Sequence, residues 1–265
     1  MPVPEQAIAD TDHGLALEAV REAGALALLR FRKGVKAWRK ADGTPVSDAD
    51  IAVDKLLRDR LRAARPHYGW VSEESEATYQ GEERFWLVDP IDGTSAYLSG
   101  NPSWCISLAL IENGIAVLGF IHAPAEARTY SAQRQGGARL NGRTIAVSPR
   151  RELEGARLIV NASALKPQRW QRPLPAIERL SVPSLALRLA YVAEGSCEGA
   201  LALSYKHDWD LAAGDVIVRE AKGMMSDLDG AELRYSEHHP PRRGFIAAPP
   251  GIHAALMARG PRPIE

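Results

Sequence analysis

Hydrophobic side chains recur every three or four positions through residues 5–33, a stretch that is also rich in Ala and Leu. Both features are typical of helices, so we predict one long helix here. A second helix is expected from Ser47 to about Ala64, because Ser47 can cap its start and Asp50 stands at the third helical position, as in a variant of the capping box. The spacing places three aliphatic residues on the buried side of this helix: Ile51, Leu56 and Leu57.

Short apolar runs between turn residues predict strands in the first half of the chain. Residues 69–72 and 85–88 each lead into acidic residues, and Pro90 should stop the second run because proline cannot donate to a central ladder. Asn113-Gly114 between two further runs is a strong hairpin pattern. The runs expected in an antiparallel sheet are residues 104–111, 115–122, 128–132 and 143–147.

Strand-like and helix-like segments alternate in the second half, which is typical of an α/β arrangement. The expected strands are residues 157–160, 199–203, 224–227 and 244–248. The expected helices are residues 166–179, interrupted by proline, 185–193 and 210–221. Ser148-Pro149-Arg150-Arg151 is the predicted boundary between an N-terminal α+β domain, residues 1–148, and a C-terminal α/β domain, residues 149–265.

Composition narrows the class of protein. The charges balance, with 33 Lys and Arg against 33 Asp and Glu, so nothing in the net charge favours a nucleic-acid polymer or an anionic membrane as partner. No apolar stretch reaches membrane-spanning length, and the first residues lack the features of a signal peptide. Cys105 and Cys197 are too few for a disulfide framework or a zinc site. These observations predict a cytoplasmic enzyme.

The stretch Asp89-Pro90-Ile91-Asp92-Gly93-Thr94 carries the strongest chemical pattern. Two carboxylates three residues apart at the end of a strand can face one point, and hard divalent cations prefer oxygen ligands. A helix that begins at Gly93-Thr94 would offer free backbone amides as a seat for phosphate. The combination suggests phosphate chemistry, although the same residue types also dominate ordinary polar turns.

Three other stretches accompany this motif: Lys40–Asp50, Ser72-Glu73-Glu74-Ser75, and Trp209-Asp210 followed by small residues. Together the four resemble the signatures of the inositol monophosphatase family, whose members are magnesium-dependent, lithium-sensitive phosphatases. The resemblance extends over roughly residues 15–250. It implies a layered α–β–α–β–α sandwich, a homodimer, and hydrolysis of a small phosphate ester.

The resemblance also implies which residues hold metal. One magnesium ion would be bound by Glu74, Asp89 and the backbone carbonyl of Ile91. A second would be bound by Asp89, Asp92 and Asp210, with Asp89 as the bridging ligand. Oxygen ligands of this kind suit magnesium, and the substrate phosphate would complete its coordination shell.

A weaker third ion would use Glu74 and, through water, Asp50, which gives two to three ions per site. Glu73 and Glu74 follow a predicted strand, where neighbouring side chains point to opposite faces, so only Glu74 is expected to bind metal directly. Thr94 and Asp50 match the family pair that orients and deprotonates the attacking water, and Glu74 acts with them in catalysis. The backbone amides expected to hold the phosphate are those of Gly93, Thr94 and Ser95.

Departures from the family pattern bear on the substrate. Leu203 stands where inositol monophosphatases carry a glutamate that contacts sugar hydroxyls, whereas relatives that hydrolyse 3′(2′),5′-bisphosphonucleotides are apolar there. Arg188 stands where those nucleotidases carry a basic residue, and a second phosphate needs a cation. With Ser184, these residues are the expected substrate contacts. They favour a bacterial 3′(2′),5′-bisphosphate nucleotidase acting on adenosine 3′,5′-bisphosphate.

Other functions stay open at this point. Inositol 1-phosphate is the main alternative substrate, and histidinol phosphate is another, because the stretch from Lys40 to Ser47 also resembles histidinol-phosphate phosphatases. A regulator that binds macromolecules is the alternative without catalysis. The family resemblance further implies inhibition by lithium.

Overall fold

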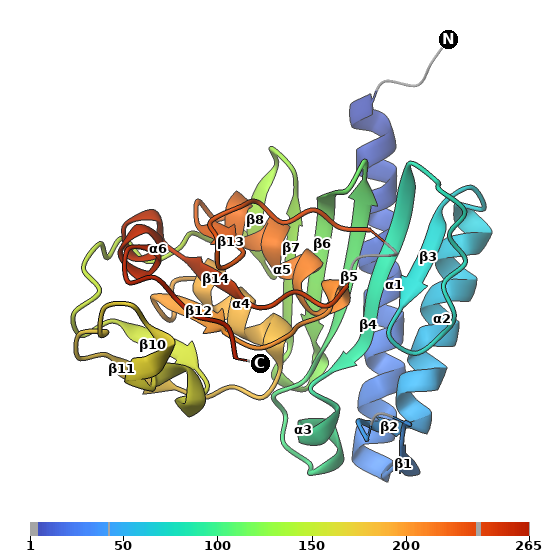
Figure 1. Ribbon diagram of the computed structural model, residues 1–265. Helices are drawn as coiled ribbons and strands as arrows, with labels where there is room; N and C mark the ends of the chain where they lie inside the picture. The colour runs from blue at the N-terminus through green and yellow to red at the C-terminus, as the bar shows by residue number, and fades with distance from the viewer. Residues whose placement is uncertain (1–4, 42, 237–239, 265) are drawn as a thin grey trace.

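The computed structural model describes residues 5–41, 43–236 and 240–264. Within these ranges the chain forms a seven-stranded sheet, a five-stranded sheet and a small two-stranded hairpin (Figure 1). The helices are α1 (Glu5–Lys33), α2 (Asp48–Ala64), α3 (Thr94–Leu98), α4 (Leu185–Ala193), α5 (Asp208–Glu220) and α6 (Pro250–Met257).

Hydrophobic clusters join these elements into five layers. α1 and α2 pack on one face of the large sheet, α4 and α5 fill the space between the two sheets, and α6 covers the outer face of the second sheet (Figure 1). The expected α–β–α–β–α sandwich is therefore confirmed. No helix in the described ranges is long and apolar enough to cross a membrane, and the cytoplasmic location stays a prediction.

The large sheet has the strand order β3-β4-β5-β6-β7-β8-β9. β3 and β4 are parallel, and all the other neighbours are antiparallel. The strands are β3 (Gly69–Ser72), β4 (Arg84–Asp92), β5 (Cys105–Glu112), β6 (Ile115–Ala123), β7 (Arg128–Gln133), β8 (Gly137–Leu140) and β9 (Arg143–Thr144). The last strand is shorter than the predicted residues 143–147.

The second sheet has the order β11-β10-β12-β14-β13, with β10 parallel to both of its neighbours and β14 antiparallel to both of its own. Its strands are β10 (Arg157–Val160), β11 (Glu178–Leu180), β12 (Gly199–Ala202), β13 (Met224–Ser226) and β14 (Phe245–Ala248). The separate hairpin, which the sequence analysis missed, pairs β1 (Ala37–Arg39) with β2 (Pro45–Ser47). The two sheets lie on either side of the predicted boundary at residue 148, and the division into two domains stays a prediction.

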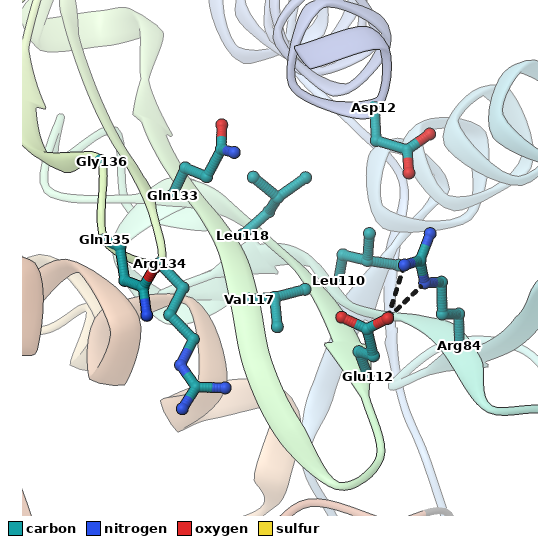
Figure 2. A pocket seen from close by; sticks show the side chains of 10 residues that line it. All are labelled: Asp12, Arg84, Leu110, Glu112, Val117, Leu118, Gln133, Arg134, Gln135 and Gly136. Atoms are coloured by element: carbon teal, nitrogen blue, oxygen red, sulfur yellow. Dashed lines mark hydrogen bonds and ion pairs between the residues drawn. The ribbon is translucent and has the colours of Figure 1, made fainter. Parts of the chain in front are cut away.

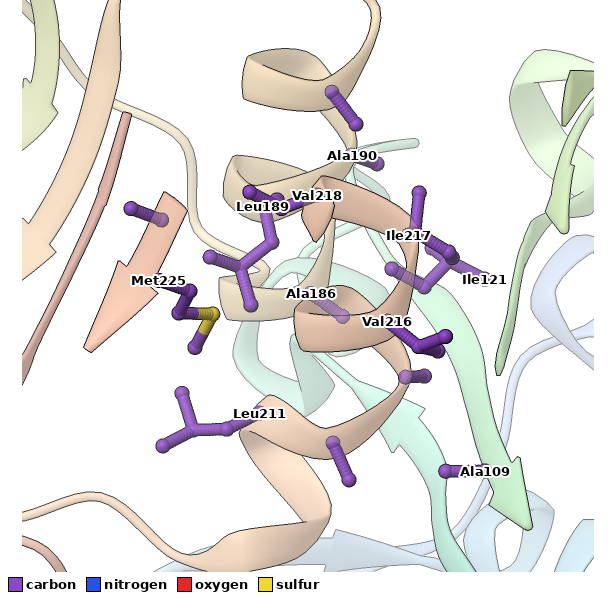
Figure 3. Close-up of a cluster of buried hydrophobic side chains, with 14 of the residues drawn as sticks. Ala109, Ile121, Ala186, Leu189, Ala190, Leu211, Val216, Ile217, Val218 and Met225 are labelled. Atoms are coloured by element: carbon purple, nitrogen blue, oxygen red, sulfur yellow. The ribbon is translucent and has the colours of Figure 1, made fainter. Parts of the chain in front are cut away.

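The middle layer is the largest apolar cluster and fixes the site against both sheets. Along β5, Ile106 and Leu108 face α1 and α2, while Ala109 and Ile111 face the middle layer, as strand alternation requires. Figure 3 shows how α4 and α5 contribute to this layer beside β5 and β6. Gly119 on β6 allows the close approach, because a Cβ there would lie 2.6 Å from the carbonyl oxygen of Ala213.

Two predictions about helices were wrong. Ile51 is not on the buried side of α2 but is 42% exposed, and the apolar residues that α2 buries are instead Ala49, Val53, Leu57 and Leu61. Residues 166–179 form no α-helix, only a 3₁₀ turn at Pro167–Arg169 and irregular chain up to β11. Prolines 167, 173 and 175 lack the N–H donors that a continuous helix would need. The helix α6 had not been predicted.

Candidate active site

The acidic motif lies at the end of β4, where the strand meets the N-termini of α4 and α5. Contrary to prediction, β4 does not stop at Pro90 but continues to Asp92 through an irregularity: Asp89 pairs with Ser107 on β5, whereas Asp92 pairs with Cys105. Asp89 and Asp92 are three residues apart on β4, but their partners Ser107 and Cys105 are only two residues apart on β5. One extra residue on β4 is the geometry of a β-bulge. The bulge offsets strand alternation and lets both carboxylates point to the same face, toward α4 and α5.

Asp210, from the first turn of α5, joins the two aspartates of β4. Carboxylate oxygens of Asp89, Asp92 and Asp210 all lie within 4.8 Å of one another, and Asp89 and Asp92 are buried. The Asp210 carboxylate also accepts a hydrogen bond of 2.9 Å from the backbone N–H of His207, so it supports the start of α5 as well. The expected convergence of these three residues on one point is therefore present.

The cluster has the chemistry of a cation site. Burial, followed by the charge of Glu73, raises the pKa of Asp89 well above its usual value, and the buried Oδ1 of Asp89 has no hydrogen-bond partner. Burial and then the charge of Asp92 raise the pKa of Asp210 to about 7. An unpartnered carboxylate oxygen among other buried carboxylates is costly unless a cation binds it. Three carboxylates in close contact fit a hard divalent ion such as magnesium.

The two glutamates after β3 make different contacts. Glu73 carries the charge that acts on Asp89, Asp210 and Asp50. Glu74 forms an ion pair of 2.6 Å with Lys40, and only 3% of its side chain is exposed. Burial raises the pKa of Glu74 to about 7. Lys40 also pairs with Glu73, at 3.0 Å, so the direct metal ligand Glu74 stays a prediction, with Glu73 as the alternative.

Asp50 and Thr94 lie together beside the cluster, as expected. The hydroxyl of Thr94 is 3.3 Å from Oδ1 of Asp50 and 3.1 Å from the carbonyl oxygen of Ile91, and it can donate to either. The other oxygen of Asp50 accepts hydrogen bonds from the backbone N–H and the hydroxyl of Ser47, at 2.8 and 2.5 Å. This capping box at the start of α2 fixes the carboxylate, and burial raises its pKa.

Comparison with known proteins agrees with the geometry. The model of the inositol monophosphatase family matches residues 10–261. The chain belongs to the inositol monophosphatase family. It is thus a phosphatase with an acidic metal-binding cluster at the end of β4.

Individual relatives carry several names. The chain is 35% identical over 255 residues to the Nus factor SuhB of Xylella fastidiosa, and the alignment covers 92% of each chain. It is 35% identical to an inositol-1-monophosphatase of Mesorhizobium japonicum, over 73% of this chain and 76% of the relative. It is also 35% identical to a histidinol-phosphatase of Mycobacterium tuberculosis, over 82% of this chain and 87% of that relative. The crystal structure of an IMPase from Thermotoga maritima aligns with a TM-score of 0.80, at 29% identity, over 92% of this chain and 94% of the other. None of these four carries a nucleotidase name, so the comparisons do not support the predicted preference for that subclass.

The backbone amides expected to bind phosphate lie at the start of α3. Gly93 precedes the helix with a φ of +97°, and a Cβ there would lie 3.1 Å from the carbonyl oxygen of Ser103, so glycine suits this position. The amides of Thr94 and Ser95 lie in the first turn of α3, where amides have no intrahelical acceptor. Phosphate binding by these amides stays a prediction.

Ser184 is hydrogen-bonded to a carboxylate of the acidic cluster. It caps α4, and its hydroxyl donates a hydrogen bond of 2.5 Å to Oδ2 of Asp92, which also accepts the backbone N–H of Ala186 at 2.6 Å. The positive end of the α4 dipole therefore points at a carboxylate of the cluster. This hydrogen bond gives Ser184 a positioning role toward Asp92, and its contact with substrate stays a prediction.

The side chains expected to set specificity lie in different places. Leu203 is only 1% exposed and packs in the cluster beneath α6, so it presents no surface to a substrate; this prediction was wrong. Arg188 donates to the carbonyl oxygen of Val182 at 2.7 Å and lies close enough for the charge of Asp92 to act on it. Lys206, which the sequence analysis missed, lies near Asp210 and Asp92. Its only sequence clue is its place four residues before Asp210.

A separate pocket of about 480 Å³ lies far from this cluster (Figure 2). It is lined by Arg84 and Glu112, which form an ion pair at the start of β4 and the end of β5, and by residues of the β7–β8 turn. Arg84 and Asp92 are at opposite ends of β4, roughly 25 Å apart at the usual rise of a strand. The pocket is therefore no part of the metal site.

Proposed function

We propose that this chain is a magnesium-dependent phosphomonoesterase that hydrolyses small phosphate esters such as inositol 1-phosphate or histidinol phosphate. The single observation that supports this most strongly is the buried, unpartnered oxygen of Asp89 between two other carboxylates. The similarity to an inositol-1-monophosphatase and a histidinol-phosphatase, each at 35% identity, supports these two esters as the first to test.

In this proposal Glu73, Asp89 and the carbonyl of Ile91 would hold one magnesium ion, and Asp89, Asp92 and Asp210 would hold a second. Bound magnesium supplies Lewis-acid chemistry: it polarises the phosphate and lowers the pKa of water. The protein residues do the rest. Asp50 accepts the proton of the attacking water through the Thr94 hydroxyl, and Ser184 keeps the Asp92 carboxylate oriented.

Adenosine 3′,5′-bisphosphate is a second candidate substrate because of two cations beside the cluster. Arg188 and Lys206 both lie within electrostatic reach of Asp92, and each is partly removed from solvent. A second phosphate on the substrate would find its counter-charge there. Arg188→Ala should then weaken turnover of the bisphosphate and leave inositol 1-phosphate unaffected.

The test is a panel of phosphate esters with magnesium, ranked by kcat/KM. We expect inositol 1-phosphate or histidinol phosphate to be the best substrate, with the Asp89→Asn variant inactive on all of them. A preference for adenosine 3′,5′-bisphosphate that Arg188→Ala removes would establish the second candidate. Absence of magnesium-dependent hydrolysis of any ester would refute the proposal and leave a purely binding function.

A further inference from the structure

Another cleft, of about 570 Å³, lies where the chain crosses from the large sheet to the second sheet. Its walls are residues 146–151, which follow β9, the C-terminal end of α5 at Ala221 and Lys222, and residues 249–251, where α6 begins. Asp210 lies in the first turn of α5, roughly 16 Å along the helix from Ala221. The cleft is therefore separate from the acidic cluster.

The uncharged part of the cleft is mostly apolar. Val147 packs against the middle layer, and its backbone N–H donates to the carbonyl oxygen of Ala221 at 3.0 Å. Pro149, Pro249 and Pro250 line the cleft as well, and proline has no backbone N–H that a ligand could leave unsatisfied. An apolar group in this cleft would therefore be removed from water against apolar surface, which is favourable.

Every charged residue that lines the cleft is basic, although the whole chain carries equal numbers of basic and acidic residues. Arg150 donates to the carbonyl oxygens of Glu152 and Glu154, so its guanidinium is held by the adjacent loop. Arg151 and Lys222 are exposed, and neither forms an ion pair with another residue of the described ranges. The partial negative charge at the end of α5 would explain a cation at Lys222, but it does not explain Arg151.

We propose that this cleft binds a small organic anion. A phosphate, sulfonate or carboxylate group would pair with Arg151 and Lys222, and the apolar body of the ligand would lie against Val147 and the prolines. The volume falls within the range of small-molecule sites, about 300–1,000 Å³. A stable protein partner would need about 20–30 residues on each side, whereas eleven described residues line this cleft. The inference goes beyond the proposed function and does not depend on it.

The experiment uses a pair of fluorescent probes on the full chain. Anilinonaphthalene sulfonate is an anion whose fluorescence rises when its rings leave water, and phenylnaphthylamine has the same rings without the sulfonate. Both are titrated in EDTA, so that no bound metal ion attracts the anion. The difference between the two affinities reports the contribution of the cations, and sedimentation of each protein reports its state of association.

Three double variants locate the site. The first carries Arg151→Gln and Lys222→Gln, which removes both free cations of the cleft. The second carries Arg151→Lys and Lys222→Arg, which keeps both charges. The matched control carries Lys166→Gln and Arg172→Gln, which removes two exposed cations outside the cleft and changes the net charge by the same amount.

We expect the unmodified protein to bind one sulfonate probe per chain, more tightly than the neutral probe. Removal of both cations should weaken the sulfonate at least roughly tenfold, as the loss of hydrogen bonds between charged groups does. The affinity for the neutral probe should not change. The control and the variant that keeps both charges should bind both probes like the unmodified protein.

Three results would overturn the inference. One is an unchanged affinity for the sulfonate after Arg151→Gln and Lys222→Gln. Another is an equal loss in the control, because the net charge rather than the cleft would then decide binding. The third is a dimer that dissociates when the two cations of the cleft are removed, because a second copy of the chain would then be the occupant. None of these results bears on phosphatase activity, so the proposed function is tested separately.

Discussion

Removing one charge from the acidic cluster should stabilise the metal-stripped protein while abolishing its activity. The substitution is Asp210→Asn, which keeps the side-chain oxygen that accepts the N–H of His207. The folded protein raises the pKa of Asp210 from 3.8 to about 7, so without a metal the ionised carboxylate opposes folding. The destabilisation is absent at pH values below the unfolded pKa, grows as the pH rises through the interval up to about 7, and is complete above it.

The size of the effect follows from that shift. A rise from 3.8 to about 7 corresponds to about 4 kcal/mol as an upper bound. Asp210 is partly exposed, so solvent screening reduces this, and we expect Asp210→Asn to gain about 1–3 kcal/mol of unfolding free energy at pH 8 in EDTA. At pH 4 the gain should nearly vanish. Saturating magnesium should offset most or all of this gain, because an ion at a hundred times its Kd adds about 2.7 kcal/mol to the protein that binds it.

Urea unfolding monitored by tryptophan fluorescence measures this directly, at pH 4, 6 and 8, with EDTA and with magnesium. Titrating groups that the charge of Asp210 does not reach cancel in the difference between variant and unmodified protein, whereas Asp89 and Lys206, on which that charge acts, contribute to it. Asp229→Asn, which removes an exposed carboxylate in the turn after β13, is the matched control and should give no pH-dependent difference. A metal-stripped Asp210→Asn protein that is less stable than the unmodified one at pH 8 would refute the reasoning.

Three further outcomes are expected. Glu73→Gln should lower kcat/KM by at least roughly a hundredfold, because the loss of a single electrostatic contact in the transition state has about this effect. Glu74→Gln should lower kcat/KM less. The reverse order of the two variants in steady-state kinetics would make Glu74 the ligand. Ser184→Ala should lower the free energy of unfolding by about 1–2 kcal/mol, because it removes the cap of α4 and a hydrogen bond to Asp92. It should also raise the magnesium concentration needed for half-maximal activity. A loss of stability with an unchanged magnesium requirement would make Ser184 purely structural. Lithium should inhibit uncompetitively, because it matches magnesium in size but carries half the charge and can trap the product. Sodium should not inhibit in this way. Purely competitive inhibition by lithium in initial-rate measurements would contradict the prediction.

The sequence predicted the site where local chemistry decides it. The capping box at Ser47 and Asp50 and the glycine before α3 follow from short-range rules, and the structure contains both. The convergence of Asp210 with Asp89 could not be derived from spacing, since it depends on how α5 packs against β5. Family resemblance supplied that link, because its motifs record a tertiary arrangement that periodicity does not contain.

Errors arose where tertiary contacts override a local rule. Alternation predicts opposite faces for Glu73 and Glu74, but β3 ends at Ser72, and both carboxylates reach the ammonium group of Lys40. The contacts of Lys40 do not single out either glutamate as the metal ligand, because its ammonium pairs with both. Likewise, an apolar residue at position 203 suggested a lining for a base, yet Leu203 simply fills the core beneath α6.

The position of the cluster explains why the two sheets must pack as they do. Asp92 belongs to the large sheet, but its hydrogen bonds come from Ser184 and Ala186 at the start of α4, in the middle layer. Ser107 of β5, in turn, donates to the carbonyl of Trp209 on α5. The polar contacts that orient the carboxylates are therefore the same ones that dock α4 and α5 on the large sheet. A cation that binds the cluster must then stabilise the packing of the middle layer on this sheet, so metal binding and the folding of the whole sandwich are one coupled equilibrium.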